Sequence, residues 1–352
     1  MTVDYLIVGQ GICGTMLSYY LHKEGKTYMV IDDSKQNASS RVAAGVINPV
    51  TGRRYVYTWM IDELMSFAKQ SYNELEDYFQ TPLIYQKSII DFFPSPQMRD
   101  AFVNRVLEDD TYLHTYPDQN KFNQYFNYDF GCGEIGPCYM VDLQHLLLML
   151  RSKLIEQRSF VQESFNLEDL GLKNDHIRYN DITASKIIFC DGISSMKNPW
   201  FELLPFSANK GEALIIQSED LTNEHIFKKS MVVAPLFKEN LYWVGSNYQW
   251  EFENDQPSDK FYNTTKILLD NWLRVAYTII EHKAAVRPAT LERRPFVGLH
   301  PHQPLVGILN GMGTKGTSLT PYFANQLVQY LVHGLPIQDD ANISRFSRLL
   351  SK

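Results

Sequence analysis

The sequence predicts an α/β fold in which two discontinuous domains are interleaved along the chain. The chain opens with an apolar run, a glycine-rich turn and a helical pattern, and the same order returns over Pro304 to Val332. Another helical pattern lies mid-chain at Asp142 to Ile155, and short β-like runs separate these segments. The length of 352 residues suits about two domains. Interleaved domains therefore explain the order of elements better than two consecutive ones.

The first elements are predicted to be a strand, a helix and a second strand. Val3 to Val8 is apolar and too short for a helix, which favours a buried parallel strand. Met16 to Lys23 has helical spacing of its apolar residues, and Gly25 ends that pattern. Tyr28 to Ile31 then forms a second short apolar run that ends before Asp32. This order predicts a compact βαβ unit.

The rest of the sequence predicts helices, short strands and one stretch of short broken runs. Met60 to Phe79 carries an apolar stripe at three- and four-residue steps, which is typical of an amphipathic helix. Ile84 to Phe130 contains short runs broken by prolines and rich in aromatic residues. Phe261 to Ala276 is predicted to be a helix. Further strands are expected over Phe160 to Glu163, Ile177 to Tyr179, Lys186 to Cys190, Ala213 to Ile216, Met231 to Ala234 and Tyr242 to Val244.

Composition excludes several classes of protein. Lys and Arg number 33 against 40 Asp and Glu, a formal net charge of −7 that makes a nucleic-acid partner unlikely on electrostatic grounds. No apolar run approaches the roughly 20 residues of a membrane span, and the N-terminus does not resemble a signal peptide. The four cysteines have neither paired nor zinc-ligand spacing. We expect a cytoplasmic protein without a metal site or a membrane partner; the oligomeric state stays open.

The turn after the first strand has the pattern of a dinucleotide-binding site. Gly9, Gly11 and Gly14 form Gly-x-Gly-x-x-Gly, and Asp32 follows the next strand. The glycines permit a tight turn, close approach of a pyrophosphate to the backbone and close packing of helix on strand. The helix N-terminus offers free N–H groups to the phosphates, and Asp32 can accept hydrogen bonds from the adenosine ribose. The motif predicts FAD or NAD, and the acid disfavours NADP; a glycine turn without a ligand is the alternative.

Segments further along the chain resemble the D-amino acid oxidase (DAO) superfamily of FAD-dependent amine oxidoreductases. Ser39 to Pro49 looks like its second flavin segment, in which Ala and Gly let the backbone pass beside the isoalloxazine ring. Ala285 to Thr290, Pro295 to Gly298 and Asn310 to Pro321 follow the family's order of an Arg-Pro strand, a Pro-x-x-Gly turn and a glycine-rich loop before the last helix. Lys186 to Gly192 resembles its mid-chain strand ending in Gly near FAD. The glycine oxidase and sarcosine oxidase branch is most similar.

The resemblance implies a Rossmann-type FAD-binding domain, interleaved with a β-rich substrate domain. It implies FAD as a non-covalent cofactor, because no cysteine lies between Ala285 and Leu319. Asp191 departs from the small residue that the family usually has there. The cofactor-binding residues expected are Gly9, Gly11, Ile12, Gly14, Asp32, Asp33, Ser40, Arg41, Ala43, Ala44, Gly45, Val46, Val161, Asp191, Gly192, Gly311, Gly313, Thr314, Lys315, Gly316 and Thr317.

The expected reaction is oxidation of a C–N bond in an amino acid or secondary amine, by hydride transfer to flavin N5, giving an imine. In the resembling family the Arg of the Arg-Pro motif binds the substrate carboxylate, which assigns that role to Arg287. Lys315 lies in the glycine loop and could add a cation near the flavin. A structural ion pair is the alternative for Arg287, and a solvated loop position is the alternative for Lys315. No histidine is singled out, because hydride transfer from a neutral amine needs no strong base.

The domain boundaries expected are 1–80, 140–205 and 285–352 for the FAD-binding domain, and 81–139 and 206–284 for the substrate domain. Three other functions stay open. An NAD-dependent dehydrogenase would use only the first βαβ unit and leaves the C-terminal glycine loop unexplained. A tRNA-base-modifying FAD oxidoreductase is disfavoured by the charge of −7. A non-catalytic or assembly subunit that binds FAD is disfavoured by Arg287.

Overall fold

The computed structural model describes residues 1–351, and the chain divides into two compact units. Unit 1 comprises Met1–Arg41, Leu143–Asn209 and Val286–Lys352, and unit 2 comprises Val42–Asp142 and Lys210–Ala285. Each unit is built from separate stretches of chain, so the predicted interleaving of two domains is confirmed. Within the described residues, no helix has both the length and the apolar composition needed to cross a membrane.

The units differ from the expected domains mainly in the segment 42–80. The expectation placed 1–80 with the FAD-binding domain, whereas 42–80 belongs to unit 2. The reason is strand pairing and packing: β3 (Val46–Ile47) pairs antiparallel with β8 (Cys132–Val141), and α3 (Ile61–Phe79) contacts β6 (Ile84–Phe92). Which unit binds the cofactor and which binds the substrate stays a prediction.

Unit 1 is built on a mostly parallel sheet. Its strands run in the order β10-β11-β12-β1-β2-β9, and β19 pairs with both β12 and β18. The pairs β12–β1, β1–β2, β2–β9 and β12–β19 are parallel, and this explains why the C-terminal halves of β1 and β12 are apolar and buried. The bounds are β1 Thr2–Val8, β2 Tyr28–Ile31, β9 Phe160–Val161, β10 Leu170–Leu172, β11 Ile177–Tyr179, β12 Ile182–Phe189, β18 Phe296–His300 and β19 Gln303–Asn310.

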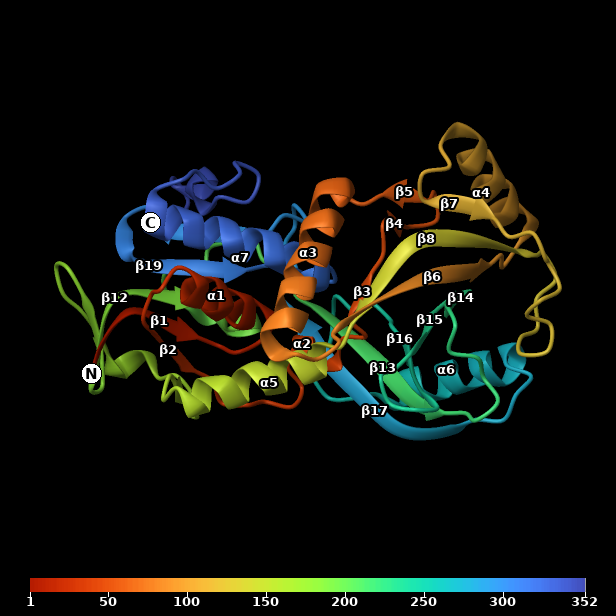
Figure 1. Cartoon of the computed structure of the whole chain (residues 1–352), viewed down its shortest axis with the longest axis horizontal. Helices are drawn as coiled ribbons and strands as arrows, with labels where there is room; N and C mark the ends of the chain where they lie inside the picture. The colour runs from red at the N-terminus through yellow and green to blue at the C-terminus, as the bar shows by residue number, and fades with distance from the viewer. Residues whose placement is uncertain (352) are drawn as a thin grey trace. The chain divides into compact units, whose positions relative to one another are not determined.

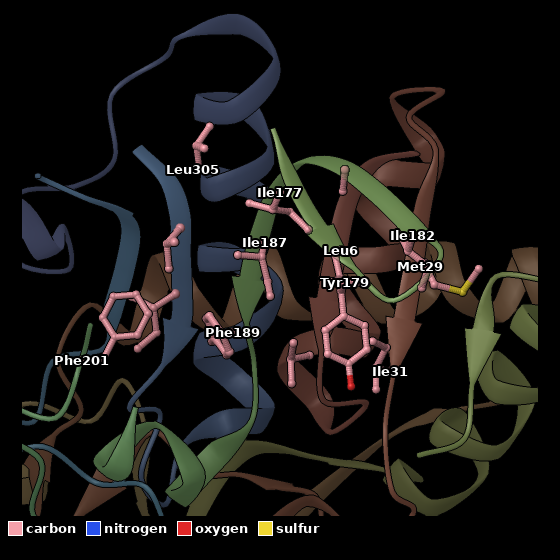
Figure 2. Close-up of a cluster of buried hydrophobic side chains, with 14 of the residues drawn as sticks. Leu6, Met29, Ile31, Ile177, Tyr179, Ile182, Ile187, Phe189, Phe201 and Leu305 are labelled. Carbon is pink, nitrogen blue, oxygen red and sulfur yellow. The ribbon is translucent and has the colours of Figure 1, made fainter. Parts of the chain in front are cut away.

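Helices of unit 1 pack on this sheet and on one another. Helix α1 (Ile12–Lys23) contacts both α7 (Gly316–His333) and α5 (Leu143–Glu156), as Figure 1 shows for the red, blue and yellow-green ribbons. The short helix α2 (Ser39–Val42) follows β2, and 3₁₀ turns cover Leu167–Asp169, Gly192–Lys197 and Ile343–Phe346. Between the strands and the C-terminal segment lies an apolar core that includes Leu6, Ile187, Phe189 and Phe201 (Figure 2).

Unit 2 contains a mixed sheet and an aromatic core. Its strands run in the order β17-β13-β16-β15-β14-β6-β8-β3, with β7 paired to β8, and a small hairpin joins β4 to β5. The core gathers buried aromatic rings from distant segments, among them Phe92, Phe126, Phe227 and Trp272. Bounds not yet given are β4 Val50–Thr51, β5 Val56–Tyr57, β7 Leu113–Thr115, β13 Asn209–Gln217, β14 Ile226–Lys228, β15 Val232–Pro235, β16 Leu241–Gly245, α6 Asp259–Trp272 and β17 Thr278–Arg287.

One helix of unit 2 was not predicted. The sequence pattern over Ile84 to Phe130 indicated only short runs broken by prolines, but α4 (Pro96–Glu108) is a regular helix. Ser95 caps it by accepting a hydrogen bond from the N–H of Met98 at 3.3 Å, and Pro96 occupies the first turn. Proline at that position lacks only an N–H that a helix start would leave unpaired, so Pro96 begins the helix and does not break one.

Candidate active site

The glycine turn joins β1 to α1 as the motif predicts. Gly9 has a φ of +97°, and a Cβ on Gly14 would lie 1.9 Å from the carbonyl oxygen of Gly9. Only glycine fits at Gly14, because any side chain would collide with backbone that cannot move away. This close approach sets the start of α1 directly against the end of β1.

The N-terminus of α1 opens beside Ser40. Gly11 is the N-cap residue and offers no side chain to the first turn. The N–H of Ile12 donates to Ser40 Oγ at 3.0 Å, and a Cβ on Gly11 would lie 3.1 Å from the same oxygen. The N–H groups and partial positive charge of this helix end suit an anionic phosphate. Ser40, Gly11 and Ile12, three of the residues predicted to bind the cofactor, thus lie together.

Asp32 lies at the end of β2 and is held by several donors. Its Oδ2 accepts from the N–H of Gln10 at 2.8 Å, and its Oδ1 accepts from the N–H of Ser34 at 2.8 Å and from Arg151 Nη2 at 2.6 Å. The Arg41 guanidinium lies 3.9 Å from Oδ1. The carboxylate is therefore fixed beside the glycine turn, where the motif places the ribose hydroxyls.

The neighbours of Asp32 include the other predicted residues of this region. The N–H of Asp32 donates to the carbonyl of Val161 at 3.2 Å, because β9 pairs with β2. Asp33 faces a different set of groups: its carboxylate pairs with Lys35 at 2.9 Å and accepts from Ser164 Oγ at 3.3 Å. Val161 therefore lies next to Asp32, whereas Asp33 is engaged with a nearby loop.

The C-terminal glycine loop lies against the first helix, although about 300 residues separate them in the sequence. A Cβ on Gly316, the first residue of α7, would lie 3.4 Å from Ile12 Cγ2. Further along the two helices, Cys13 Sγ and Thr320 Oγ1 are 3.8 Å apart. The N-terminal ends of α1 and α7 therefore lie side by side. Two helix N-termini at one place make a strongly anion-binding environment.

Backbone contacts tie the same loop to the Arg-Pro motif. The N–H of Gly313 donates to the carbonyl of Pro288 at 3.2 Å, and Gly311 and Gly313 both have positive φ. Lys315 caps α7 with its carbonyl, which accepts from the N–H groups of Ser318 and Leu319. Burial lowers the pKa of Lys315 to about 8. The lysine is thus a partly desolvated cation within the loop.

Asp191 lies where β12 ends, next to Gly9. A Cβ on Gly9 would approach the Asp191 Cα to 3.0 Å. Ser195 Oγ donates to Asp191 Oδ1, and Asn310 Nδ2 donates both to Ser195 Oγ at 2.9 Å and to the carbonyl of Gly192 at 2.7 Å. Burial raises the pKa of Asp191 to about 6, partly opposed by the Ser195 hydrogen bond. Asp191, where the resembling family usually has a small residue, is thus held within the turn by hydrogen bonding.

Arg287 is the last residue of β17, and its side chain contacts Asn209. Arg287 Nη1 donates to Asn209 Oδ1 at 2.7 Å. The backbones on either side are also joined: the N–H of Ser207 donates to the carbonyl of Ala289 at 2.7 Å, and Phe206 bridges Thr290. Because the amide oxygen carries no net charge, this contact orients the guanidinium without neutralising it.

The predicted residues Ala43, Ala44, Gly45 and Val46 belong to unit 2. Gly45 has a φ of +75°, and a Cβ there would lie 2.0 Å from the carbonyl oxygen of Val141. The N–H of Val141 donates to the carbonyl of Gly45 at 2.9 Å. Contact with β8 alone therefore requires glycine at this position, and the proposed approach to a flavin ring stays a prediction.

The residues of unit 1 fit a dinucleotide such as FAD. Gly11 and Gly14 add no side chain at the start of α1, two helix N-termini converge, and Asp32 stands at the end of the second strand. Within residues 1–351, no group of three His, Cys, Asp or Glu residues has the arrangement of a metal site. Sequence reasoning missed polar residues that complete the site, because no motif marks them: Gln10, Ser34, Arg151, Ser195, Asn209 and Asn310.

The sequence contains two Arg-Arg pairs, Arg53–Arg54 and Arg293–Arg294, which occupy different environments. Arg53 and Arg54 are exposed in the hairpin between β4 and β5. Arg294 lies 3.8 Å from Asp340, and its Nη1 donates to the carbonyl of Arg293 at 3.2 Å. A structural role for Arg294 agrees with this carboxylate contact.

Comparison with known proteins assigns the family. A family model described as FAD dependent oxidoreductase (DAO) matches residues 4–330. Glycine oxidase from Geobacillus kaustophilus aligns with a TM-score of 0.78 at 14% identity, covering 98% of each chain. Iminodiacetate oxidase from Chelativorans sp. BNC1 gives 0.75 at 18% identity and 98% of each chain, and L-proline dehydrogenase from P. horikoshii gives 0.74 at 13%, covering 99% and 98%. The chain belongs to the DAO family of FAD-dependent oxidoreductases.

Proposed function

We propose that this FAD-dependent oxidoreductase oxidises the C–N bond of a small amino acid or of another amine that carries a carboxylate. The observation that supports this most directly is Arg287, whose guanidinium is held by a neutral amide at 2.7 Å within the Arg-Pro motif. The names of three structural neighbours, glycine oxidase, iminodiacetate oxidase and L-proline dehydrogenase, each specify a substrate with both a nitrogen and a carboxylate. Binding such a substrate requires a cationic side chain that faces its carboxylate.

The chain's own residues would bind and orient the two reactants. FAD, when bound, would supply the redox chemistry for oxidation of the carbon next to nitrogen, giving an imine that water hydrolyses. The N-termini of α1 and α7 would hold the anionic parts of the cofactor, and Asp32 would accept hydrogen bonds from its ribose. Arg287 would grip the substrate carboxylate through two N–H groups, which fixes the direction of the amine-bearing carbon.

Lys315 is proposed to add positive charge at the same loop. Its pKa of about 8 leaves the ammonium mostly protonated at pH 7, and partial desolvation strengthens its field. Such a cation would stabilise negative charge near the loop that precedes α7.

We also propose that the cofactor is held without a covalent bond. Cys13 lies in α1 near the glycine turn, but burial raises the pKa of its thiol to about 12. The thiolate, which is the reactive form, is therefore absent at neutral pH. Denaturation in trichloroacetic acid should release the yellow flavin into the supernatant, and flavin retained in the pellet would contradict this proposal.

Replacing Arg287 tests the proposed substrate class. Arg287→Ala should lower kcat/KM for carboxylated amines by more than 30-fold, because the substrate's charge loses its partner. This corresponds to a loss of about 2–5 kcal/mol of binding energy in the transition state. Amines without a carboxylate should be affected far less. Arg287→Lys keeps the charge but loses the planar two-point contact, so an intermediate loss is expected. Equal losses for both classes of amine would show that Arg287 acts only in the structure.

A further inference from the structure

The turn that follows β12 carries an acidic side chain, Asp191, directly beside the glycine turn. The N–H of Cys190 donates to the carbonyl of Val8 at 2.8 Å, and a Cβ on Gly9 would lie 3.0 Å from the Asp191 Cα. Among residues 1–351, no lysine, arginine or histidine forms an ion pair with the Asp191 carboxylate. An acid without a cation thus lies where two helix N-termini favour an anion.

Hydrogen bonding determines which oxygen of Asp191 can carry a proton. Asn310 Oδ1 accepts from the N–H of Gly311 at 2.8 Å, and Asn310 Nδ2 donates to the carbonyl of Gly192 at 2.7 Å, so only one orientation of the amide makes both bonds. The second N–H of this amide donates to Ser195 Oγ at 2.9 Å. The single hydroxyl proton of Ser195 therefore points to Asp191 Oδ1, which must be an acceptor. A proton on Asp191 is consequently carried by Oδ2.

The other carboxyl oxygen, Oδ2, is left open. It has no hydrogen-bond partner among the described residues, and it is not one of the fully buried polar atoms. Ser195 and Asn310 are 0% and 2% exposed and fix the carboxyl group through Oδ1. An open carboxyl oxygen repels an anion when it is charged, and it can donate a short, charge-assisted hydrogen bond to that anion when it is protonated.

The segments around Asp191 supply no counter-charge to its carboxylate. Their charged and titratable groups are Cys190 at the end of β12, Cys13 on α1, Lys197 on the 3₁₀ turn, Asp32 beyond the glycine turn and Lys315 before α7. Burial raises the pKa of both thiols, to about 12 for Cys13, so both are neutral at ordinary pH. Asp32 is paired with Arg151 at 2.6 Å, and Lys197 is exposed. Neutralisation of Asp191 therefore requires a proton.

We propose that FAD binding is coupled to the uptake of one proton, which passes from solvent to Asp191 Oδ2. The neutral acid would then donate a hydrogen bond from Oδ2 to an anionic group of the cofactor. This inference rests on the proposed placement of those anionic groups at the glycine turn. It goes further by naming the acid that makes cofactor affinity depend on pH. Ser195 and Asn310 are positioning residues, because they hold this acid and tie it to the loop before α7.

The pH dependence has a definite sign. Burial raises the pKa of Asp191 to about 6 before FAD binds, and the negative charge of the cofactor would raise it further. Bound protein then keeps the proton at pH values where free protein has lost it. FAD affinity is therefore full below about pH 6 and falls as the pH rises above it.

FAD titration of the flavin-free protein at pH 5.5 and 7.5 tests this coupling. Fluorescence gives the affinity, and calorimetry in buffers of different ionisation enthalpy gives the number of protons taken up. The wild-type dissociation constant should rise by about 10-fold or more between the two pH values. Asp191→Asn and Asp191→Ala should reduce that rise to about 2-fold, abolish most of the proton uptake, and bind FAD more tightly than the wild type at pH 7.5.

Two further variants separate this role from a purely structural one. Ser195→Ala removes the donor to Oδ1 and so raises the pKa of Asp191. The pH at which FAD affinity begins to fall should therefore move upward by about half a unit or more. Asp169→Asn removes an exposed charge of unit 1 that accepts from Asn166 Nδ2 at 3.0 Å, and it should keep the wild-type pH dependence.

The outcomes distinguish the inference from its premise. Equal pH dependence and proton uptake in the wild type and both Asp191 variants would overturn the inference. Because no substrate is present, that result leaves the proposed substrate class untouched. Gly11→Val should abolish FAD binding, since its side chain would block the approach of a phosphate to the backbone. Undiminished FAD affinity in Gly11→Val would overturn the placement of the cofactor and the inference together.

Discussion

Asp191 places an acidic side chain beside the glycine turn, where a bound pyrophosphate would add further negative charge. Its carboxylate has a pKa of about 6, because burial disfavours the charged form. The pKa of an unfolded aspartate is about 3.9, so the native state holds this proton more tightly than the unfolded state does. The stability that this group contributes is full below about pH 4 and is lost as the pH rises through 6.

Asp191→Asn should therefore stabilise the protein at neutral pH. The amide can still accept the hydrogen bond from Ser195, but it carries no charge to desolvate. We expect the variant to exceed the wild type by on the order of 1–2 kcal/mol at pH 7.5, since Asp191 is only partly buried, with the difference shrinking toward zero near pH 4. Urea unfolding at pH 4.5 and 7.5 measures this. A difference that is the same at both pH values would contradict the assigned pKa.

Helix α5 contributes one long side chain, Arg151, to the proposed cofactor site. Arg151 Nε donates to Gln10 Oε1 at 2.7 Å, Nη1 donates to Ser34 Oγ, and Nη2 donates to Asp32 Oδ1 at 2.6 Å. One arginine therefore joins the glycine turn, the end of β2 and the loop after it. Its charge also offsets that of Asp32, which would otherwise repel the phosphates of FAD.

Arg151→Met should weaken FAD binding. The variant keeps most of the aliphatic stem, but it releases the Asp32 carboxylate and leaves its charge less compensated. We expect the FAD dissociation constant to rise by about 10-fold or more, measured by fluorescence titration of reconstituted protein. Lys153→Met on the same helix, where Lys153 pairs with Glu156 and not with Asp32, is the matched control and should bind FAD like the wild type. A dissociation constant for Arg151→Met equal to that of the control would contradict this role.

Local elements were predictable where the sequence carries a local signal. The strand Tyr28–Ile31 was predicted at its exact bounds, and the first and last helices were found from their glycine turns and apolar spacing. The helix α4 was missed because Pro96 was interpreted as a break, although Ser95 before it is a cap. Apolar periodicity and glycine patterns extend over only a few residues, and they are sufficient to predict single helices and strands.

Contacts between distant elements could not be predicted in the same way. Arg151 is 119 residues from Asp32, and Asn209 is 78 residues from Arg287. No sequence motif links the two members of either pair, because the contact depends on the order in which strands and helices are arranged in the fold. The motif residues Asp32 and Arg287 were therefore predicted, while the residues that hold them were not.

At the scale of the whole molecule, two interleaved units and a matching family model define an FAD-dependent oxidoreductase. Within unit 1, the glycine turn, Asp32, the turn at Asp191 and the loop before α7 come from four separate stretches of chain. Their convergence is the structural basis for placing the cofactor there. The proposed role of Arg287 in binding a carboxylate predicts that the substrate is a carboxylated amine.

Anaerobic titration of the purified protein, followed by its visible absorption spectrum, tests this account most directly. Glycine, sarcosine, proline and a panel of D-amino acids are added in turn, each beside the matching amine without a carboxylate. We predict flavin absorption bands that bleach with at least one carboxylated amine and not with its decarboxylated counterpart. Absence of flavin after reconstitution with FAD, or equal bleaching by both members of a pair, would contradict the account.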